Sequence, residues 1–328
     1  MPDRPRVFAT RALPGEALEE LASACELEVW GEPRAPEPAA LADRAAEAEG
    51  LLCLLTDRID AGLLARCPRL RAVSSVSAGV DHVDLAAATA RRIPVGHTPG
   101  VLTETTADLA FALLLAAARR IAEGDRWVRA GQWRPDSVWE PDRLLGCDLH
   151  GATLGIVGFG AIGAAVARRA RGFAMHVLGW SRSRRAVPDL SDVEWVPLAE
   201  LLERCDFVSV HLPRSPETLG LLGPAELARM KPGAVLVNTA RGGIVDERAL
   251  ATALRDGRLA AAGLDVFARE PLDSASPLRS LENVVLTPHI GSASGATRAR
   301  MADRAARNLL AALRDQPMPW CANPEVYG

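Results

Sequence analysis

Three side chains in the second half of the sequence have the types and positions that acid–base chemistry on a carbonyl group requires. Arg241, Glu270 and His289 each follow an apolar segment that is typical of a buried strand. The ends of parallel strands meet at one edge of a sheet, where ligands bind. Singly, these residues could be a turn cap, a solvated carboxylate and a core histidine. Together they predict a site where an arginine holds a 2-oxo acid, a histidine transfers a proton and a glutamate orients that histidine.

A glycine-rich turn opens the segment expected to bind the cofactor of such a reaction. It consists of Gly158, Phe159, Gly160, Ala161, Ile162 and Gly163, between an apolar segment at 153–157 and a helical segment at 164–171. Strand, glycine turn and helix in this order form the dinucleotide-binding fingerprint. We expect Gly158 to permit the tight turn, Gly160 to admit the pyrophosphate and Gly163 to let the helix pack closely on the strand.

The residues after the next predicted strand indicate which dinucleotide is bound. The strand at 176–180 is followed by Ser181, Arg182, Ser183, Arg184 and Arg185, and no carboxylate precedes Asp189 in this segment. An NAD site commonly places Asp or Glu there, on the ribose 2′-hydroxyl, whereas arginine binds a 2′-phosphate through charge-assisted hydrogen bonds. The sequence therefore predicts NADP(H) as the preferred cofactor. NAD(H) is the alternative if these residues form only a solvated basic turn.

Apolar, β-prone segments alternate with helical ones along the chain. They lie at 6–10, 51–56, 72–76, 95–98, 153–157, 176–180, 207–212, 234–239, 261–266 and 284–287. This alternation predicts parallel sheets covered by helices on both faces. Since the glycine turn lies in mid-chain, the strands before it are expected to form a separate, smaller α/β domain. With crossings at Pro99 and Pro288, the substrate domain comprises residues 1–99 plus 288–328, and the NADP-binding domain comprises residues 100–287.

The segment at 123–150 is too long for an ordinary connection between secondary structure elements. It carries Trp127, Trp133 and Trp139 among many charged residues. Aromatic residues are common anchors of protein interfaces. We therefore expect this segment to be an arm that packs on a second subunit, which predicts a homodimer.

The composition argues against nucleic acid and membrane partners. With 328 residues and a net charge of −3, the chain is long enough for two domains and has no excess of positive charge. Its longest apolar helical segment, at 107–118, is too short to span a bilayer, and no apolar signal segment opens the sequence. The six cysteines lack metal-ligand spacing. They predict reduced thiols in a cytoplasmic protein and no metal site.

Short motifs occur in order through nearly the whole chain. They are LLCLLTD at 51–57, VSAGVDH at 76–82, TETTAD at 103–108, GFGAIG at 158–163, NTARG at 238–242, LDVF at 264–267, EP at 270–271 and PHIGS at 288–292. In this order they resemble the D-isomer-specific 2-hydroxyacid dehydrogenase family, and within it the glyoxylate/hydroxypyruvate reductases. The resemblance implies an α/β fold of two doubly wound parallel-sheet domains. A Rossmann dinucleotide-binding domain is then inserted into a discontinuous, flavodoxin-like substrate domain.

The resemblance also implies roles for individual residues. Arg241, Glu270 and His289 are the implied catalytic set, which reduces glyoxylate to glycolate or hydroxypyruvate to D-glycerate. Besides the glycine turn and Ser181–Ser183, the residues implied around the cofactor are Thr106, Pro213, Thr218, Thr239, Ala240, Asp265 and Gly291. The residues implied around the substrate are Leu55, Val76, Ser77, Ala78, Gly79, Arg241 and Trp139. Backbone N–H groups of the 76–79 turn are expected to hold the substrate carboxylate.

Trp139 matches a tryptophan that, in the hydroxypyruvate-reducing branch, reaches the active site of the neighbouring subunit. A large ring there would favour small substrates. A plain interface anchor is the alternative role for this residue. Close relatives often have a second aromatic residue where this sequence has Arg143, so the sequence leaves the outer wall of the pocket open.

Other functions share these motifs and stay as alternatives. Phosphoglycerate dehydrogenases commonly prefer NAD, and D-lactate-type enzymes differ in the 2-oxo acid that they reduce. Corepressors of the C-terminal-binding-protein type keep the catalytic residues but use the scaffold as an NAD(H)-sensing binding module. The Ser-Arg-Ser sequence at 181–183 favours an NADPH-dependent reductase over the NAD-binding alternatives.

Overall fold

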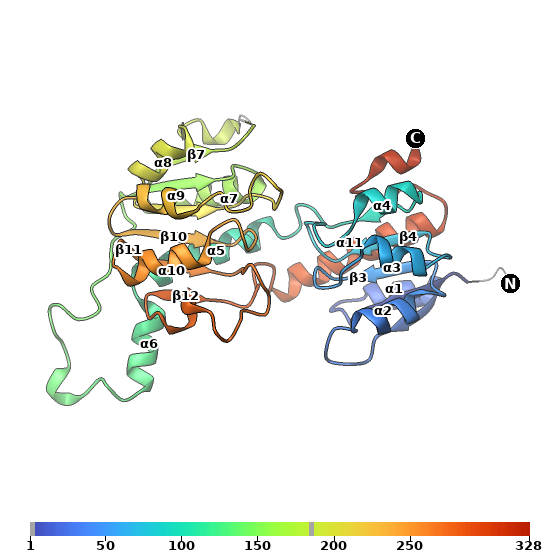
Figure 1. The fold of residues 1–328 in the computed structure, drawn as a ribbon, viewed down its shortest axis with the longest axis horizontal. Helices are drawn as coiled ribbons and strands as arrows, with labels where there is room; N and C mark the ends of the chain where they lie inside the picture. Colours follow the sequence, from blue (N-terminus) through green and yellow to red (C-terminus); the bar gives the residue numbers. More distant parts are fainter. Residues whose placement is uncertain (1–3, 184–186) are drawn as a thin grey trace. The chain divides into compact units, whose positions relative to one another are not determined.

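The computed structural model describes residues 4–183 and 187–328, which form two compact units (Figure 1). Unit 1 comprises Met1–Leu102 and Ser292–Gly328, and unit 2 comprises Thr103–Gly291. The second boundary lies after the crossing expected at Pro288, because the backbone of residues 289–291 is hydrogen-bonded to Asp265 of unit 2.

Unit 1 contains a five-stranded parallel sheet with the strand order β2-β1-β3-β4-β5. Its strands are β1 (Arg6–Ala9), β2 (Glu26–Val29), β3 (Gly50–Cys53), β4 (Ala72–Ser75) and β5 (Val95–Gly96). Its α-helices are α1 (Ala17–Ala24), α2 (Pro38–Ala45), α3 (Ala61–Arg66), α4 (Leu85–Ala90) and α11 (Gly295–Leu313). On β3, Leu51 and Cys53 pack in one apolar core and Leu52 in another. The sheet is therefore buried on both faces, as parallel sheets usually are.

Unit 2 contains a seven-stranded parallel sheet with the strand order β12-β11-β10-β9-β6-β7-β8. Its strands are β6 (Thr153–Val157), β7 (His176–Trp180), β8 (Glu194–Trp195), β9 (Phe207–Val210), β10 (Ala234–Asn238), β11 (Leu259–Leu264) and β12 (Val284–Leu286). Its α-helices are α5 (Thr103–Ala118), α6 (Ile121–Arg129), α7 (Ala161–Ala170), α8 (Leu198–Arg204), α9 (Pro224–Arg229) and α10 (Glu247–Arg255). The strand order reverses at β6, which is where doubly wound sheets bind ligands. The predicted α/β fold with two parallel sheets is confirmed.

Every strand expected from the sequence is present, and two further strands, β2 and β8, lie at sheet edges. The sequence of β2 is Glu-Leu-Glu-Val, with both glutamates exposed, and β8 is only two residues long. The prediction relied on continuous apolar segments, which mark strands that are buried on both faces. Because β2 carries exposed glutamates and β8 has only two residues, this criterion misses both, whereas it finds the apolar edge strands β5 and β12.

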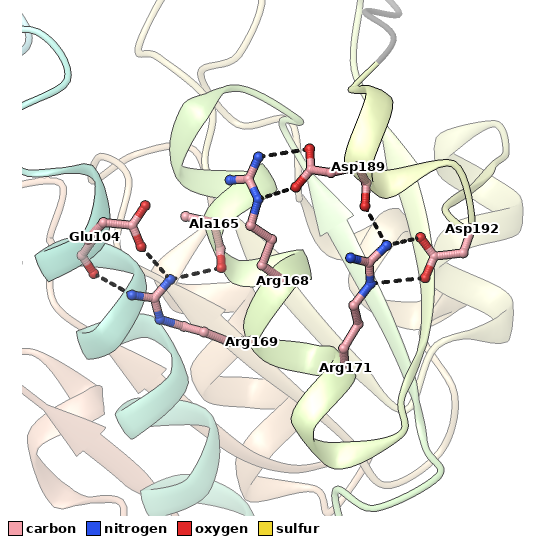
Figure 2. A network of polar contacts seen from close by, with 7 residues as sticks. All are labelled: Glu104, Ala165, Arg168, Arg169, Arg171, Asp189 and Asp192. Carbon is pink, nitrogen blue, oxygen red and sulfur yellow. Dashed lines mark hydrogen bonds and ion pairs between the residues drawn. The ribbon is translucent and has the colours of Figure 1, made fainter.

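Arg168 and Arg169 of α7, with Arg171 directly after it in the 3-10 helix η2 (Arg171–Phe173), connect this helix to the chain on either side of it, as Figure 2 shows. The ion pairs are Arg168–Asp189 (2.6 Å), Arg171–Asp192 (2.5 Å) and Arg169–Glu104 (2.8 Å). The hydrogen bonds from the arginines lower the pKa of Asp189 and of Asp192. Exposed pairs such as these contribute little singly. Together they hold α7 against the first turn of α5 and against the short 3-10 helix η3 (Pro188–Leu190).

The segment between α6 and β6 is largely exposed and contains the short 3-10 helix η1 (Pro135–Ser137). Trp139 is 80% exposed and Leu145 is 65% exposed. The Arg143 guanidinium lies 4.6 Å from the ring centroid of Trp127. The segment thus presents large apolar side chains on its surface. That it packs on a second subunit stays a prediction.

Other short 3-10 helices are η2 (Arg171–Phe173), η4 (Pro277–Ser280) and η5 (Pro324–Tyr327). None of the helices in the described part of the chain has the length and apolar character to cross a membrane. All six cysteines are free thiols, and burial raises the pKa of Cys205 to about 12. Within residues 4–183 and 187–328, no cluster of histidine, cysteine and acidic residues could hold a metal ion.

Candidate active site

The acid–base pair expected from the sequence is formed in unit 2, after β11 and β12. The Nδ1 atom of His289 lies 2.7 Å from Oε2 of Glu270. The other carboxylate oxygen of Glu270 accepts a 3.0 Å hydrogen bond from the Phe267 N–H. Burial raises the pKa of Glu270, but the hydrogen bonds from His289 and Phe267 and the charge of Arg241 outweigh it, so the net pKa is lowered. Because Nδ1 faces Glu270, Nε2 is the ring nitrogen that can exchange a proton with a ligand.

One buried carboxylate, Asp265, holds the backbone around His289. Its side chain accepts hydrogen bonds from the N–H groups of Ile290 and Gly291, both at 2.8 Å. Its carbonyl oxygen accepts a 2.9 Å bond from the His289 N–H. His289 has a φ of 53°, in the left-handed region, which costs a non-glycine residue roughly 1–2 kcal/mol. These bonds stabilise that conformation, and burial raises the pKa of Asp265 although the bonds it accepts oppose the rise.

Arg241 follows β10, the neighbour of β11 in the sheet, and lies at the loop that carries Glu270. Asn238 fixes the turn before it, because its Nδ2 donates to the Arg241 carbonyl at 3.0 Å. A Cβ at Gly242 would lie 1.8 Å from the Phe267 carbonyl oxygen, so only glycine allows the two loops this close approach. The charge of Arg241 lowers the pKa of Glu270. The structure therefore brings together the three residues predicted to be catalytic.

The glycine turn between β6 and α7 has an open position and two crowded ones. Gly158 has a φ of 101°, and a Cβ there would lie 2.7 Å from the His211 carbonyl carbon. At Gly163 a Cβ would lie 2.5 Å from the Gly158 carbonyl oxygen. At Gly160 an added Cβ would meet nothing within 4 Å. Open space at Gly160, next to the unsatisfied N–H groups that begin α7, fits a pyrophosphate.

The other members of the glycine turn differ in what they offer a ligand. The ring of Phe159 is buried and lies 5.0 Å, between centroids, from the ring of Trp195. Its backbone, rather than its ring, is therefore available at the turn. Ala161 and Ile162 form the first turn of α7, where backbone N–H groups lack partners within the helix.

The residues predicted to bind a 2′-phosphate form an exposed turn after β7. Ser181 Oγ donates to the Ser183 carbonyl at 2.8 Å. Arg182 Nη1 lies 3.4 Å from Oε2 of Glu217, a residue that the sequence motifs do not single out. The arginines at 184–185 lie outside the described residues.

The loop after β9 brings Glu217 to Arg182. Thr218 Oγ1 donates to the Pro213 carbonyl and accepts from the Ser215 N–H, each at 2.8 Å. Ser215 Oγ donates to Glu217 at 2.6 Å, which lowers the pKa of Glu217. Pro213 and Thr218, both implied around the cofactor, thus lie in one closed loop. Only the sheet order could have revealed Glu217, since β7 and β9 are both paired with β6.

Two buried polar atoms near the predicted cofactor residues have no hydrogen-bond partner among the described residues. They are Oγ1 of Thr239 and Nδ1 of His211, which follow the neighbouring strands β10 and β9. Desolvation lowers the pKa of His211 to about 3. Ala240, next to Thr239, is also buried, whereas Thr106 Oγ1 donates to the Gly291 carbonyl at 3.0 Å. Buried atoms left without partners fit a site that a bound ligand completes.

In unit 1, the predicted carboxylate-binding turn directs its carbonyl groups onto donors of the protein. The bonds are Thr98 N–H to the Ser77 carbonyl (2.7 Å), His97 Nδ1 to the Ala78 carbonyl (3.0 Å) and Ser77 Oγ to the Gly79 carbonyl (2.6 Å). In the described chain, no acceptor is bonded to the N–H groups of residues 78–80. Because C=O and N–H of a peptide point in opposite directions, these N–H groups are turned away from the donors and are available to bind an anion.

The other residues implied around the substrate differ in their burial. Val76 is buried, and its N–H donates to the Cys53 carbonyl at 2.9 Å. Leu55 is 37% exposed, next to a turn fixed by Asp57, whose carboxylate accepts from the Leu54 N–H at 2.7 Å. Trp139 lies on the exposed segment after α6. Its role at the site of a partner subunit stays a prediction.

Comparisons with known proteins identify the family of this chain. A family model described as D-isomer specific 2-hydroxyacid dehydrogenase, NAD binding domain, matches residues 111–291. A glyoxylate reductase from Korarchaeum cryptofilum (strain OPF8) is 49% identical over 324 residues, which are 98% of this chain and 97% of that protein. The crystal structure of the TT0316 protein from Thermus thermophilus is 49% identical, with a TM-score of 0.90 over 97% of this chain and 99% of that one.

A third match is an NADPH-dependent glyoxylate/hydroxypyruvate reductase from Sinorhizobium meliloti, solved in complex with NADP and malonate. It is 33% identical, with a TM-score of 0.86, and 98% of each chain is covered. The resemblance to the family that the sequence motifs indicate is confirmed by these matches. The chain belongs to the D-isomer-specific 2-hydroxyacid dehydrogenase family of NAD(P)-dependent oxidoreductases.

Proposed function

We propose that the protein uses NADPH to reduce glyoxylate to glycolate and hydroxypyruvate to D-glycerate. The observation that carries this proposal is the 2.7 Å contact between His289 and Glu270, next to Arg241, after three neighbouring strands of one sheet. A proton donor, a carboxylate that orients it and a fixed cation are what the reduction of a 2-oxo acid needs. The 49% identity to a protein named glyoxylate reductase supports the substrate class.

Each residue of the site has one role in this proposal. The N–H groups of residues 78–80 bind the substrate carboxylate, and Arg241 stabilises the negative charge that develops on the carbonyl oxygen. Protonated His289 donates its Nε2 proton to that oxygen, which becomes the product hydroxyl. Glu270 is ionised at neutral pH because its pKa is lowered, so it stabilises the imidazolium and orients the ring.

The residues of unit 2 fit a bound nicotinamide dinucleotide. The start of α7 and the open space at Gly160 suit the pyrophosphate, and Arg182 with its flanking serines suits a 2′-phosphate. Thr239 supplies a buried hydroxyl whose hydrogen bonding a ligand would complete. When bound, NADPH supplies the hydride that forms the new C–H bond. The preference for NADPH is supported by the arginine at 182 and by the lack of a carboxylate at 181–183.

We also infer that the protein is a homodimer in which residues 123–150 pack on the second copy. Support comes from Val138, Trp139 and Leu145, large apolar side chains exposed on this segment that a partner would bury. Light scattering from the full chain tests the inference. A dimer is expected, and a monomer at the concentrations used for assays would contradict it.

The substrate and cofactor are tested by following NADPH absorbance with a panel of 2-oxo acids. We expect turnover of glyoxylate and hydroxypyruvate, with a lower KM for NADPH than for NADH. Faster turnover of pyruvate would favour a D-lactate-type enzyme. A preference for NADH and a phosphorylated hydroxypyruvate would favour a phosphoglycerate dehydrogenase. Binding of NADH without turnover of any 2-oxo acid would favour a binding module.

A further inference from the structure

We propose that a directed chain of hydrogen bonds, from His82 through Ser75 and Ser77 to the Gly79 carbonyl, holds the 76–79 turn in the orientation that binds a carboxylate. His97 holds the adjacent peptide in the same way. These residues are then positioning residues for substrate recognition. The inference rests on the proposed function, in which this turn binds the substrate carboxylate. It adds which residues keep the N–H groups of the turn, rather than its carbonyl groups, directed toward that carboxylate.

The direction of the chain follows from the number of protons available. Ser77 Oγ donates its single proton to the Gly79 carbonyl, at 2.6 Å. The 2.7 Å contact between Ser75 and Ser77 must then use the Ser75 proton. Ser75 can therefore only accept from His82, whose Nε2 lies 2.9 Å away, and this fixes a proton on Nε2 of His82.

The serines of the chain are buried, and no thiolate lies beside them. Ser75 is fully buried and Ser77 nearly so. Burial raises the pKa of the neighbouring Cys53 thiol, so Cys53 stays protonated and does not require the Ser75 proton. A chain without negative charge does not repel an incoming anion, whereas an ionised cysteine at this place would.

His97 anchors the second peptide of the turn from a fixed backbone. Its Nδ1 donates to the Ala78 carbonyl at 3.0 Å, which fixes a proton on Nδ1. Its own N–H donates to the Trp320 carbonyl at 3.1 Å, and its carbonyl accepts from Asn308 Nδ2 at 3.0 Å. The backbone that carries the ring is therefore fixed independently of the turn.

The chain matters because Gly79 makes the turn easy to distort. Glycine adopts positive and negative φ at similar cost, so rotation of the peptide after Gly79 is opposed by little local strain. Such a rotation would turn the Gly79 carbonyl toward the ligand and the Val80 N–H away from it. A carbonyl dipole that faces a carboxylate repels it. The hydrogen bond from Ser77 opposes this rotation, so its loss should weaken carboxylate binding.

The test compares Ser77→Ala with a matched control, Ser74→Ala. Ser74 is also buried, on β4 three residues before Ser77, but its Oγ donates to the Ala305 carbonyl of α11 and takes no part in the chain. For Ser77→Ala we expect KM for glyoxylate to rise about 2- to 12-fold, the effect of one hydrogen bond, with kcat nearly unchanged. For Ser74→Ala we expect an unchanged KM.

Oxalate, which carries a carboxylate and cannot be reduced, provides a readout that does not depend on turnover. Its inhibition constant should rise in Ser77→Ala by the same factor as KM. An unchanged KM and oxalate constant in a folded Ser77→Ala protein would overturn the inference. A fall in kcat at constant KM would also overturn it, because that pattern indicates a role in the chemical step.

Substitutions of His82 test the direction of the chain and cover the case in which Ser77→Ala does not fold. Gln retains an N–H donor and Leu does not, so His82→Gln should bind oxalate like the wild type and His82→Leu more weakly. Equal binding by both variants would contradict the inference. If the wild type reduces no 2-oxo acid, the proposed function fails, and oxalate titration by calorimetry still tests the role of the chain.

Discussion

The proposed acid–base centre of unit 2 and the proposed carboxylate-binding turn of unit 1 are held by different chemical groups. Around His289 the partners are carboxylates, Glu270 on the ring and Asp265 on the backbone. Around the 76–79 turn the partners are hydroxyl and imidazole groups, which carry no negative charge. A general acid gains and loses a proton in every turnover, so a nearby carboxylate helps it. A turn that only recognises an anion is best fixed by groups without negative charge.

Removal of the His289 imidazole, which the carboxylates hold in place, should have the largest effect on turnover. We expect His289→Ala to lower kcat about 10²- to 10⁴-fold, the usual contribution of a general acid. Steady-state NADPH oxidation at saturating glyoxylate measures it. His176→Ala is the control, because His176 is exposed at the start of β7. Turnover near the wild-type rate in His289→Ala would show that this histidine is not the acid.

Removal of the charge of Glu270, the partner of His289, should have a smaller effect. Glu270→Gln retains one acceptor oxygen, which can still accept from Nδ1 of His289, but it loses the charge that stabilises the imidazolium and the acceptor for the Phe267 N–H. We expect kcat to fall about 10- to 100-fold, as when a hydrogen bond to a charged group is lost. The fall of kcat at high pH should begin at a lower pH than in the wild type. An identical pH profile in both proteins would remove Glu270 from the mechanism.

Glu270→Gln should also change how the free energy of unfolding depends on pH. Because the pKa of Glu270 is lower in the folded protein, its carboxylate stabilises the fold above the unfolded value of about 4.3. That contribution is lost as the pH falls from about 4.3 through the lowered folded value. Urea unfolding at several pH values should therefore show wild type and Glu270→Gln converging in this range. A constant difference between them would contradict the lowered pKa.

The residues of unit 2 that the structure brings together were the easiest to predict. Arg241, Glu270 and His289 each come after a strand of continuous apolar residues, and parallel strands place the loops at their carboxyl ends along one edge of the sheet. The strands β2 and β8 could not be found in this way, because β2 alternates exposed glutamates with apolar residues and β8 is only two residues long.

Contacts between distant loops could not be predicted either. Glu217 meets Arg182 because β7 and β9 flank β6, and the sequence of neither loop indicates the order of the strands in the sheet. The contact of His97 with the Ala78 carbonyl likewise requires β5 to lie beside β4. In both cases the residue types alone are ambiguous, since exposed glutamates and lone histidines are common in any globular protein.

The turn after β7 differs from both of these regions, because it is exposed and its Arg182 forms an ion pair with Glu217. Arg182→Gln should weaken NADPH binding about 10-fold, since a charge-assisted hydrogen bond to the 2′-phosphate is lost. NADH has no 2′-phosphate, so its affinity should not change. Titration of protein fluorescence with each cofactor measures both dissociation constants. Equal losses of affinity for NADPH and NADH would show that Arg182 does not bind the 2′-phosphate.

Substitution of Glu217, the partner of Arg182, should have the smallest effect, and it should strengthen NADPH binding rather than weaken it. In the proposed cofactor site Glu217 competes with the 2′-phosphate for Arg182, so Glu217→Gln should tighten NADPH binding. An exposed ion pair is worth about 0.2–1 kcal/mol, which corresponds to roughly a 1.5- to 5-fold change in Kd. Glu203→Gln breaks a comparably exposed pair with Arg229 and is the control. In an Arg182→Gln background this gain in NADPH affinity should disappear, because Glu217 then has no guanidinium to pair with. A gain that persists there would mean that Glu217 acts on the phosphate directly, by charge repulsion, rather than through Arg182.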